Sequence, residues 1–207
     1  MYIPEHFREE KEERLQAFIS ENSFGVLVSM HEGVPFASHL PFLFEPSEGP
    51  HGKLSGHMAR GNPHWQSLGD ARQALTIFHG PHAYVSPSWY NSPGVPTWNY
   101  VAVHVYGKSR LIEDRQTLWE LITTLTRVHE SRYESPWEPD LPDNKIDALL
   151  GMIIGFEIEI TDIQGKYKLS QNRPSDDRKR IIQRLEQEPS HWSTDIARLM
   201  ESQGSAD

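Results

Sequence analysis

The alternation of side chains between Tyr100 and Lys108 constrains the fold more than any other feature of the sequence. Val101, Val103 and Val105 fall on one face of an extended chain, and polar or aromatic side chains fall mostly on the other. A period of two residues is typical of a β-strand with one buried face. Other short apolar runs follow one another with few helical patterns between them. This succession favours an antiparallel sheet over a parallel one, whose strands alternate with helices.

We therefore expect a mainly β fold with peripheral helices, built as an antiparallel barrel. Strands are expected over 24–30, 35–45, 53–58, 73–80, 83–90, 99–114 and 152–170, and helices over 5–23, 115–130 and 176–202. Gly80 and Pro81 predict a turn between two of these strands. Pro41 indicates an edge strand or a bulge, and Pro189 is expected to break the last helix. We expect one barrel domain over 1–172 and a C-terminal helical extension over 173–207.

The composition limits the classes of site and partner. The 207 residues carry a formal charge of −9, from 20 basic and 29 acidic residues, and no cysteine. The lack of cysteine excludes disulfides, thiolate metal sites and cysteine nucleophiles. The charged N-terminal stretch lacks the apolar region of a signal peptide, and no apolar run reaches the roughly 18 residues of a membrane span. We therefore expect a cytoplasmic protein without membrane contact.

The common catalytic and metal motifs do not occur in this sequence. Eleven histidines are present, but none forms an HExxH or HxH motif, so we expect no metal site. There is no GxSxG nucleophile motif and no glycine-rich phosphate loop. Catalytic residues therefore stay unassigned, and a phosphate would have to be held by side chains and strand-end amides.

Two clusters of hydrogen-bond donors are candidates for binding an anion. In "SGHMARGNPHW", a strand leads through Arg60 into a turn where Asn62 is expected to cap a helix that starts at Pro63. In "GKYKLSQNRP", two lysines and Arg173 stand beside Ser170 and several amides. The alternatives are an ordinary surface arginine with a plain helix cap in the first cluster, and a solvated basic turn in the second.

The loop "VSPSWYNSPGVPTW" carries more aromatic surface than a loop facing water usually does. Trp89, Trp98 and Tyr100 are expected to cover a flat cofactor or to pack against a second subunit. The alternative is that they cover the core of the chain itself.

Several long segments resemble the PaiB-like, FMN-binding negative transcriptional regulators of bacteria. The similarity extends over almost the whole chain, through "MYIPEHF", "FGVLVS", "ASHLPFLF", "GHMARGNPHW", "HGPHAYVSPSWY", "VPTWNYVAVHVYG" and "GFEIEITDIQGKYKLSQNR". That family is part of the wider FMN-binding split-barrel group, which includes the pyridoxamine phosphate oxidases. The resemblance implies an antiparallel Greek-key split barrel and a homodimer with FMN sites at the interface.

The resemblance also implies which residues bind the cofactor. Carried over by position, they are Ser38, His39, His57, Met58, Arg60 and Asn62, with Lys168, Gln171 and Asn172 contributed from the last-strand motif of either subunit. The segment "SHLPFL" lacks the two charges of the phosphate clamp found in the oxidases, which argues against pyridoxamine phosphate oxidase activity. Whether FMN stays bound is left open.

The function that the family implies is repression of genes for degradative enzymes and sporulation. Direct DNA contact would have to use the basic helix that carries Arg178, Lys179, Arg180 and Arg184, because the rest of the chain is acidic. Regulation through a partner protein is the alternative route. Two further alternatives are a flavin-dependent oxidoreductase and, with less support, a haem-binding or haem-degrading protein.

Overall fold

The computed structural model describes residues 1–204, which form a mainly β fold with eight strands and five α-helices. The strands are β1 Arg8–Glu9, β2 Phe24–His31, β3 Val34–Pro41, β4 Leu43–Glu45, β5 Lys53–Ala59, β6 Arg72–Val85, β7 Thr97–Ile112 and β8 Ile153–Lys168. The helices are α1 Glu12–Glu21, α2 Arg115–Glu130, α3 Asp143–Leu150, α4 Ser175–Leu185 and α5 His191–Gly204. Three short 3-10 helices, η1 Glu5–Phe7, η2 Pro63–Ser67 and η3 Pro87–Trp89, lie in the connections.

The strands form one sheet in the order β3-β2-β6-β7-β8-β5-β4, with β1 paired to β8. The pairs β2–β3, β2–β6, β4–β5 and β5–β8 are all antiparallel. The order departs from the order in the chain, because β5 lies between β8 and β4. The edge position of β3, which ends at Pro41, confirms the prediction for that proline.

The chain divides into two compact units, and neither is continuous in sequence. The first unit contains residues 1–18, 79–103 and the described residues from 164 onward, and the second contains residues 19–78 and 104–163. The expected boundary between residues 172 and 173 falls inside the first unit, so the division into a barrel and an extension stays a prediction. No helix in residues 1–204 is long and apolar enough to cross a membrane.

In the first unit, β6 runs without a break through Gly80 and Pro81. The turn expected there is wrong, and the glycine has a different role. A Cβ on Gly80 would lie 2.7 Å from the ring of Phe18, which α1 brings onto the strand. Phe18 also packs edge-to-face on Tyr167 at 5.9 Å between ring centroids. The glycine therefore allows a close helix–strand contact.

The second unit has a core of aromatic and aliphatic side chains on the inner faces of its strands. Phe42 packs edge-to-face on Phe78 and Phe156, at centroid distances of 5.5 and 6.0 Å.

The alternation predicted in β7 is confirmed, because Val101 and Val103 in the first unit and Val105 in the second are all fully buried.

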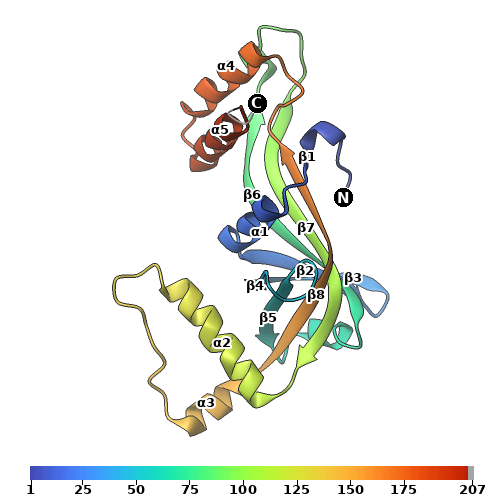
Figure 1. Cartoon of the computed structure of the whole chain (residues 1–207), viewed down its shortest axis with the longest axis vertical. Helices are drawn as coiled ribbons and strands as arrows, with labels where there is room; N and C mark the ends of the chain where they lie inside the picture. Colours follow the sequence, from blue (N-terminus) through green and yellow to red (C-terminus); the bar gives the residue numbers. More distant parts are fainter. Residues whose placement is uncertain (205–207) are drawn as a thin grey trace. The chain divides into compact units, whose positions relative to one another are not determined.

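Most of the helices expected from the sequence are present. Helix α2 has the predicted bounds, and α4 and α5 lie side by side on either side of Pro189 (Figure 1). The N-terminal helix is shorter than expected, because η1 and β1 come before it. Helix α3 is not predicted by the sequence analysis.

Close packing in the second unit predicts a strong effect of one added methyl group. A Cβ on Gly107 of β7 would overlap the carbonyl oxygen of Glu159 and the side chain of Ile158. We expect Gly107→Ala to lower the free energy of unfolding by about 1–3 kcal/mol, the usual cost of overpacking. Urea denaturation measures it, with Gly61→Ala as the matched control, since nothing lies within 4 Å of a Cβ at that position. Equal stabilities of the two variants would contradict this packing.

Candidate functional site

The turn from β5 into η2 presents Arg60 to solvent on a backbone that is held on both sides. The amide of Arg60 donates to the carbonyl oxygen of Met152 at 2.8 Å, and its carbonyl oxygen accepts from the indole of Trp65 at 3.0 Å. The amide of Asn62 closes the turn by donating to the carbonyl oxygen of Ala59 at 2.9 Å. The Arg60 side chain is exposed and makes no ion pair among the described residues. Its guanidinium group is therefore free to bind an anion.

Behind this turn lies a buried polar network centred on His64, which has no exposed surface. The Nδ1 atom of His64 lies 2.8 Å from Ser38 Oγ, and Nε2 lies 2.9 Å from Ser29 Oγ. Asn62 caps η2, as predicted, by accepting from the amide of His64, and its Nδ2 donates to Ser38 Oγ at 3.0 Å. Ser67 Oγ lies 2.6 Å from Ser29 Oγ and donates to the carbonyl oxygen of His64.

One tautomer of His64 satisfies every bond of this network. With the ring proton on Nε2, Asn62 donates to Ser38, and Ser38 donates to Nδ1. On the other side of the ring, Nε2 donates to Ser29, Ser29 donates to Ser67, and Ser67 donates to the carbonyl oxygen of His64. With the proton on Nδ1 instead, Ser29 would donate to Nε2 and Ser67 to the carbonyl oxygen of His64. No hydrogen would then lie between the oxygens of Ser29 and Ser67, which are 2.6 Å apart. The network therefore needs a neutral imidazole and fixes η2 against β2 and β3.

The electrostatics favour the same state of the ring. Burial, with a smaller contribution from the charge of nearby His31, lowers the pKa of His64 from the ordinary 6.5 to about 4. Ser38 is buried, and its hydroxyl accepts from Asn62 and donates to His64. The network positions the Arg60 turn through Asn62.

The other residues expected on these strands point in different directions. Met58 is 2% exposed and belongs to the core of the second unit. His57, one position earlier, faces the opposite side of β5 and lines an apolar cavity. His39 is exposed on β3, beside the buried Ser38. The second unit thus brings Ser38, Asn62 and the Arg60 turn together, while the side chains of Met58 and His57 are directed elsewhere.

The last-strand motif lies in the first unit, where it lines a small pocket of about 140 Å³. Lys168 and Asn172 line this pocket together with Asn99, Ser170 and Arg173. Lys168 donates to Thr97 Oγ1 and, at 2.7 Å, to the carbonyl oxygen of Trp98. Burial and the neighbouring charge of Lys166 lower the pKa of Lys168. Both causes disfavour the charged form of Lys168. A bound anion would stabilise that charged form, so the pocket is electrostatically suited to bind an anion.

Gln171 and Arg173 stabilise the turn that follows β8. Gln171 accepts from the amide of Leu169 at 2.7 Å and donates to the carbonyl oxygen of Tyr167 at 2.5 Å, so both ends of its side-chain amide are used. The guanidinium of Arg173 lies 4.1 Å from the centroid of the Tyr90 ring and donates to the carbonyl oxygen of Pro93. Gln171 is therefore a shaping residue of the pocket.

The aromatic loop lines a second pocket of the first unit, of about 300 Å³. Trp89, Trp98 and Tyr84 contribute to it, and α5 contributes Trp192, whose ring lies 4.1 Å from that of His82. Trp98 is 52% exposed, so the loop does not simply cover the core. Tyr100 lies outside this pocket and places its ring 5.3 Å from Lys166 Nζ.

The basic helix α4 offers fewer free cations than its sequence suggests. Arg178 is half-buried and donates to the carbonyl oxygen of Met200 at 3.2 Å. Arg180 is exposed, but its Nε donates to the carbonyl oxygen of Trp89 at 2.9 Å. Lys179 and Arg184 are exposed. Within residues 1–204, no cluster of three or more histidine and acidic side chains is arranged to hold a metal ion.

Comparison with known proteins gives the family of this chain. A family model described as "Putative FMN-binding domain" matches residues 1–162. Protease synthase and sporulation protein PAI 2 of Bacillus subtilis (strain 168) is 40% identical over 203 residues, which are 97% of this chain and 97% of the relative. The chain belongs to this PaiB-like, FMN-binding family. The resemblance noted in the sequence is thereby confirmed.

Solved structures share the fold of this PaiB-like protein at low sequence identity. The FAD and heme binding protein from Mycobacterium smegmatis superposes with a TM-score of 0.61 at 14% identity, covering 83% of this chain and 78% of the other. The flavocytochrome Anf3 from Azotobacter vinelandii superposes with a TM-score of 0.60 at 15% identity, covering 80% and 72%. These matches confirm the antiparallel split barrel.

The sequence analysis missed the central residue of the network in this PaiB-like protein. His64 carries no motif, and the two serines that contact its ring, Ser29 and Ser38, stand 35 and 26 residues away along the chain, so that only the fold brings them together. The one available signal was the Asn-Pro-His order after a strand, which places a histidine inside the first turn of the helix. That signal does not reveal what the ring contacts.

The His64 network makes stability depend on pH. The folded-state pKa lies below the ordinary value, so stabilisation by the neutral ring is full above about pH 6.5 and is lost as the pH falls towards 4. We expect His64→Gln to be less stable than the wild type at pH 7 by about 1–3 kcal/mol, and this difference to shrink at pH 4.5.

Urea denaturation at the two pH values measures the effect. His39→Gln is the matched control, since it changes an exposed histidine of the same unit and should retain the wild-type pH dependence. A difference between His64→Gln and the wild type that stays constant with pH would contradict the neutral, buried ring.

Proposed function

We propose that this PaiB-like protein binds FMN and acts in the cytoplasm as a negative regulator of genes, including those for degradative enzymes and sporulation. The observation that carries the proposal is the match to the relative named for protease synthesis and sporulation, at 40% identity over 97% of both chains. The family model over residues 1–162 supports the flavin part of the proposal.

The side chains present fit the parts of FMN. The phosphate needs cationic donors without carboxylate partners, and the exposed Arg60 guanidinium and the partly buried Lys168 ammonium have this character. The ribityl hydroxyls need polar side chains, which Asn172 and His39 supply. The flat ring needs apolar cover, and Trp98 has an exposed indole.

In this proposal each expected residue has a role that follows from its surroundings. Arg60 and Asn62 bind the phosphate end of FMN from the turn after β5, and Ser38 orients Asn62 by accepting a hydrogen bond from its side chain. Lys168 and Asn172 act from the pocket after β8, and Gln171 shapes that pocket.

The strand that carries His57 and Met58 contributes its backbone, since the Met58 side chain is buried in the core. When bound, FMN supplies the capacity to accept and donate electrons. The protein holds the phosphate, orients the ring and limits its contact with water.

We propose further that the protein is a homodimer in which one subunit supplies the β8 motif to the site of the other. Tyr84, Trp98 and Trp192, all in the first unit, are 47%, 52% and 41% exposed. Large aromatic side chains that remain exposed are typical of surfaces covered by a second copy.

For gene regulation, we propose that any direct DNA contact is weak and uses α4, and that a partner protein is the alternative route. Because Arg178 is held by Met200, at most three cations of this helix can reach phosphates. The salt dependence should then be modest, with a slope of log affinity against log salt no steeper than about −2.7.

The flavin part is tested by removing one guanidinium. Arg60→Ala should weaken FMN binding by about 10- to 150-fold, because it removes charge-assisted hydrogen bonds to the phosphate while the backbone of the turn is retained. Calorimetric titration of the apo-protein with FMN measures this, and Arg110→Ala is the control, as an exposed arginine of the same unit outside the turn. Equal affinities of Arg60→Ala and wild type would show that the phosphate binds elsewhere.

The DNA part is tested by the double variant Lys179→Gln with Arg184→Gln. Losing two phosphate contacts should reduce the salt slope by about 1.8 and weaken binding to a candidate promoter. The single variant Arg178→Gln should leave the slope unchanged, because its guanidinium binds inside the protein. If the slope is the same for all three proteins, α4 does not contact DNA.

A further inference from the structure

The second unit contains an apolar cavity of about 360 Å³ that the proposed flavin site does not use. Its walls come from α2, from the segment 131–142, from α3 and from the adjoining ends of β5 and β8. Trp119, Trp137, Ile146 and Met152 are among the lining side chains. This volume is in the range of cavities that hold a small molecule, about 300–1,000 Å³.

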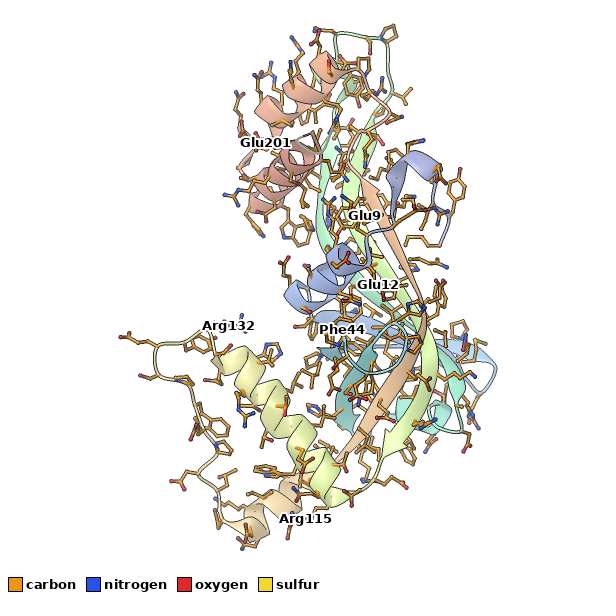
Figure 2. The ribbon with its side chains drawn as sticks, viewed as in Figure 1. Glu9, Glu12, Phe44, Arg115, Arg132 and Glu201 are labelled. Atoms are coloured by element: carbon orange, nitrogen blue, oxygen red, sulfur yellow. The ribbon has the colours of Figure 1, made fainter. Side chains whose placement is uncertain are left out.

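Polar contacts at both ends of α2 join this helix to the other elements that line the cavity. At the start of the helix, the guanidinium of Arg115 binds Asp147 of α3, with Nε 2.6 Å from Oδ1. At the other end, the amide of Trp137 donates to the carboxylate of Glu130 at 2.7 Å. Figure 2 labels Arg115 at the first of these places and Arg132 just after the last turn of α2. These contacts hold α3 and the segment 131–142 beside α2, while Trp137, Leu149 and Met152 of the lining are 55%, 52% and 67% exposed, so one side of the cavity is open to solvent.

The lining is uncharged, and its polar groups are two threonine hydroxyls, the His57 ring and the indole N–H groups of two tryptophans. Its two hydroxyls are used within α2, since Thr123 donates to the carbonyl oxygen of Trp119 at 2.9 Å and Thr126 to that of Ile122 at 2.8 Å. His57 differs, because its ring lines the cavity and neither ring nitrogen has a hydrogen-bond partner among the described residues, although Nδ1 itself is fully buried. Burial lowers the pKa of His57, so the ring is neutral at neutral pH. Because Nδ1 is shielded even from a water-sized group, a ligand in the cavity would pair with Nε2, the other nitrogen of this lining ring.

We propose that this cavity binds a neutral, planar aromatic molecule that carries a single hydroxyl group, with the hydroxyl paired to His57. The indoles of Trp119 and Trp137 favour an aromatic ligand, and the absence of charge in the lining disfavours an ionic one. A hydroxyl can both donate and accept, so it pairs with either tautomer of the imidazole. FMN does not fit this description, because its phosphate would enter a lining without a cation.

The test uses three probes of the same shape, namely 2-naphthol, naphthalene and naphthalene-2-sulfonate, titrated into the full chain by calorimetry. We expect 2-naphthol to bind about 2- to 12-fold more tightly than naphthalene, as one net hydrogen bond provides. The sulfonate should bind most weakly. This order is measured on the wild type alone, so it does not depend on a variant that folds.

Two variants locate the binding. His57→Phe should remove the difference between 2-naphthol and naphthalene while naphthalene still binds. Thr126→Trp should fill the cavity and abolish binding of both, and Thr124→Trp on the same helix is its control, because Thr124 does not line the cavity.

Several results would overturn the proposal. The first two are no binding of 2-naphthol, or a sulfonate that binds as tightly as 2-naphthol. The other two are an unchanged ratio of 2-naphthol to naphthalene affinity in His57→Phe, or equal losses of 2-naphthol affinity in Thr126→Trp and Thr124→Trp. Displacement of 2-naphthol by FMN would instead assign the cavity to the flavin. Arg60→Ala should leave 2-naphthol binding intact, so failure of the flavin proposal and failure of this one can be told apart.

Discussion

The imidazole of His64 uses both of its ring nitrogens for hydrogen bonds while no part of it reaches solvent. The geometry of the candidate site depends on this arrangement. Asn62 closes the turn that carries Arg60, and its side chain is held by Ser38 on one side and the amide of His64 on the other. A charged imidazole would add a proton on Nδ1 and turn the Ser38 hydroxyl away, which would loosen the turn. The backbone that carries Arg60 is therefore held in place, which limits the entropy that this turn would lose if the guanidinium bound an anion.

The two units provide different chemistry for recognition. The first unit combines Lys168 and Arg173 with exposed aromatic side chains, which suits a ligand with an anionic end and a flat ring. The second unit combines the exposed Arg60 with a closed neutral network and an uncharged cavity beside His57.

Local patterns in the sequence predicted the parts of the fold that depend on one segment at a time. The alternation through Val103 and the break at Pro189 are examples, since a strand face and a helix stop are properties of neighbouring residues. The turn predicted at Gly80 is wrong because the contact that requires a glycine comes from Phe18, which lies 62 residues away along the chain in a helix whose packing partner its periodicity does not reveal. The His64 network and the cavity beside α3 each join side chains from several elements. Neither could be predicted, because local patterns do not show which distant segments come together. The candidate residues came largely from the family resemblance, and the structure adds which of them, such as Met58, face the core.

Flavin binding is the property on which the proposed function of this chain rests. The most direct test is the absorbance spectrum of the purified protein after incubation with excess FMN and removal of unbound ligand by gel filtration. The account predicts that flavin absorbance elutes with the protein, with bands shifted from those of free FMN by the change in the surroundings of the ring. Complete separation of FMN from the protein at saturating concentrations, or a haem spectrum in the purified protein instead, would contradict it.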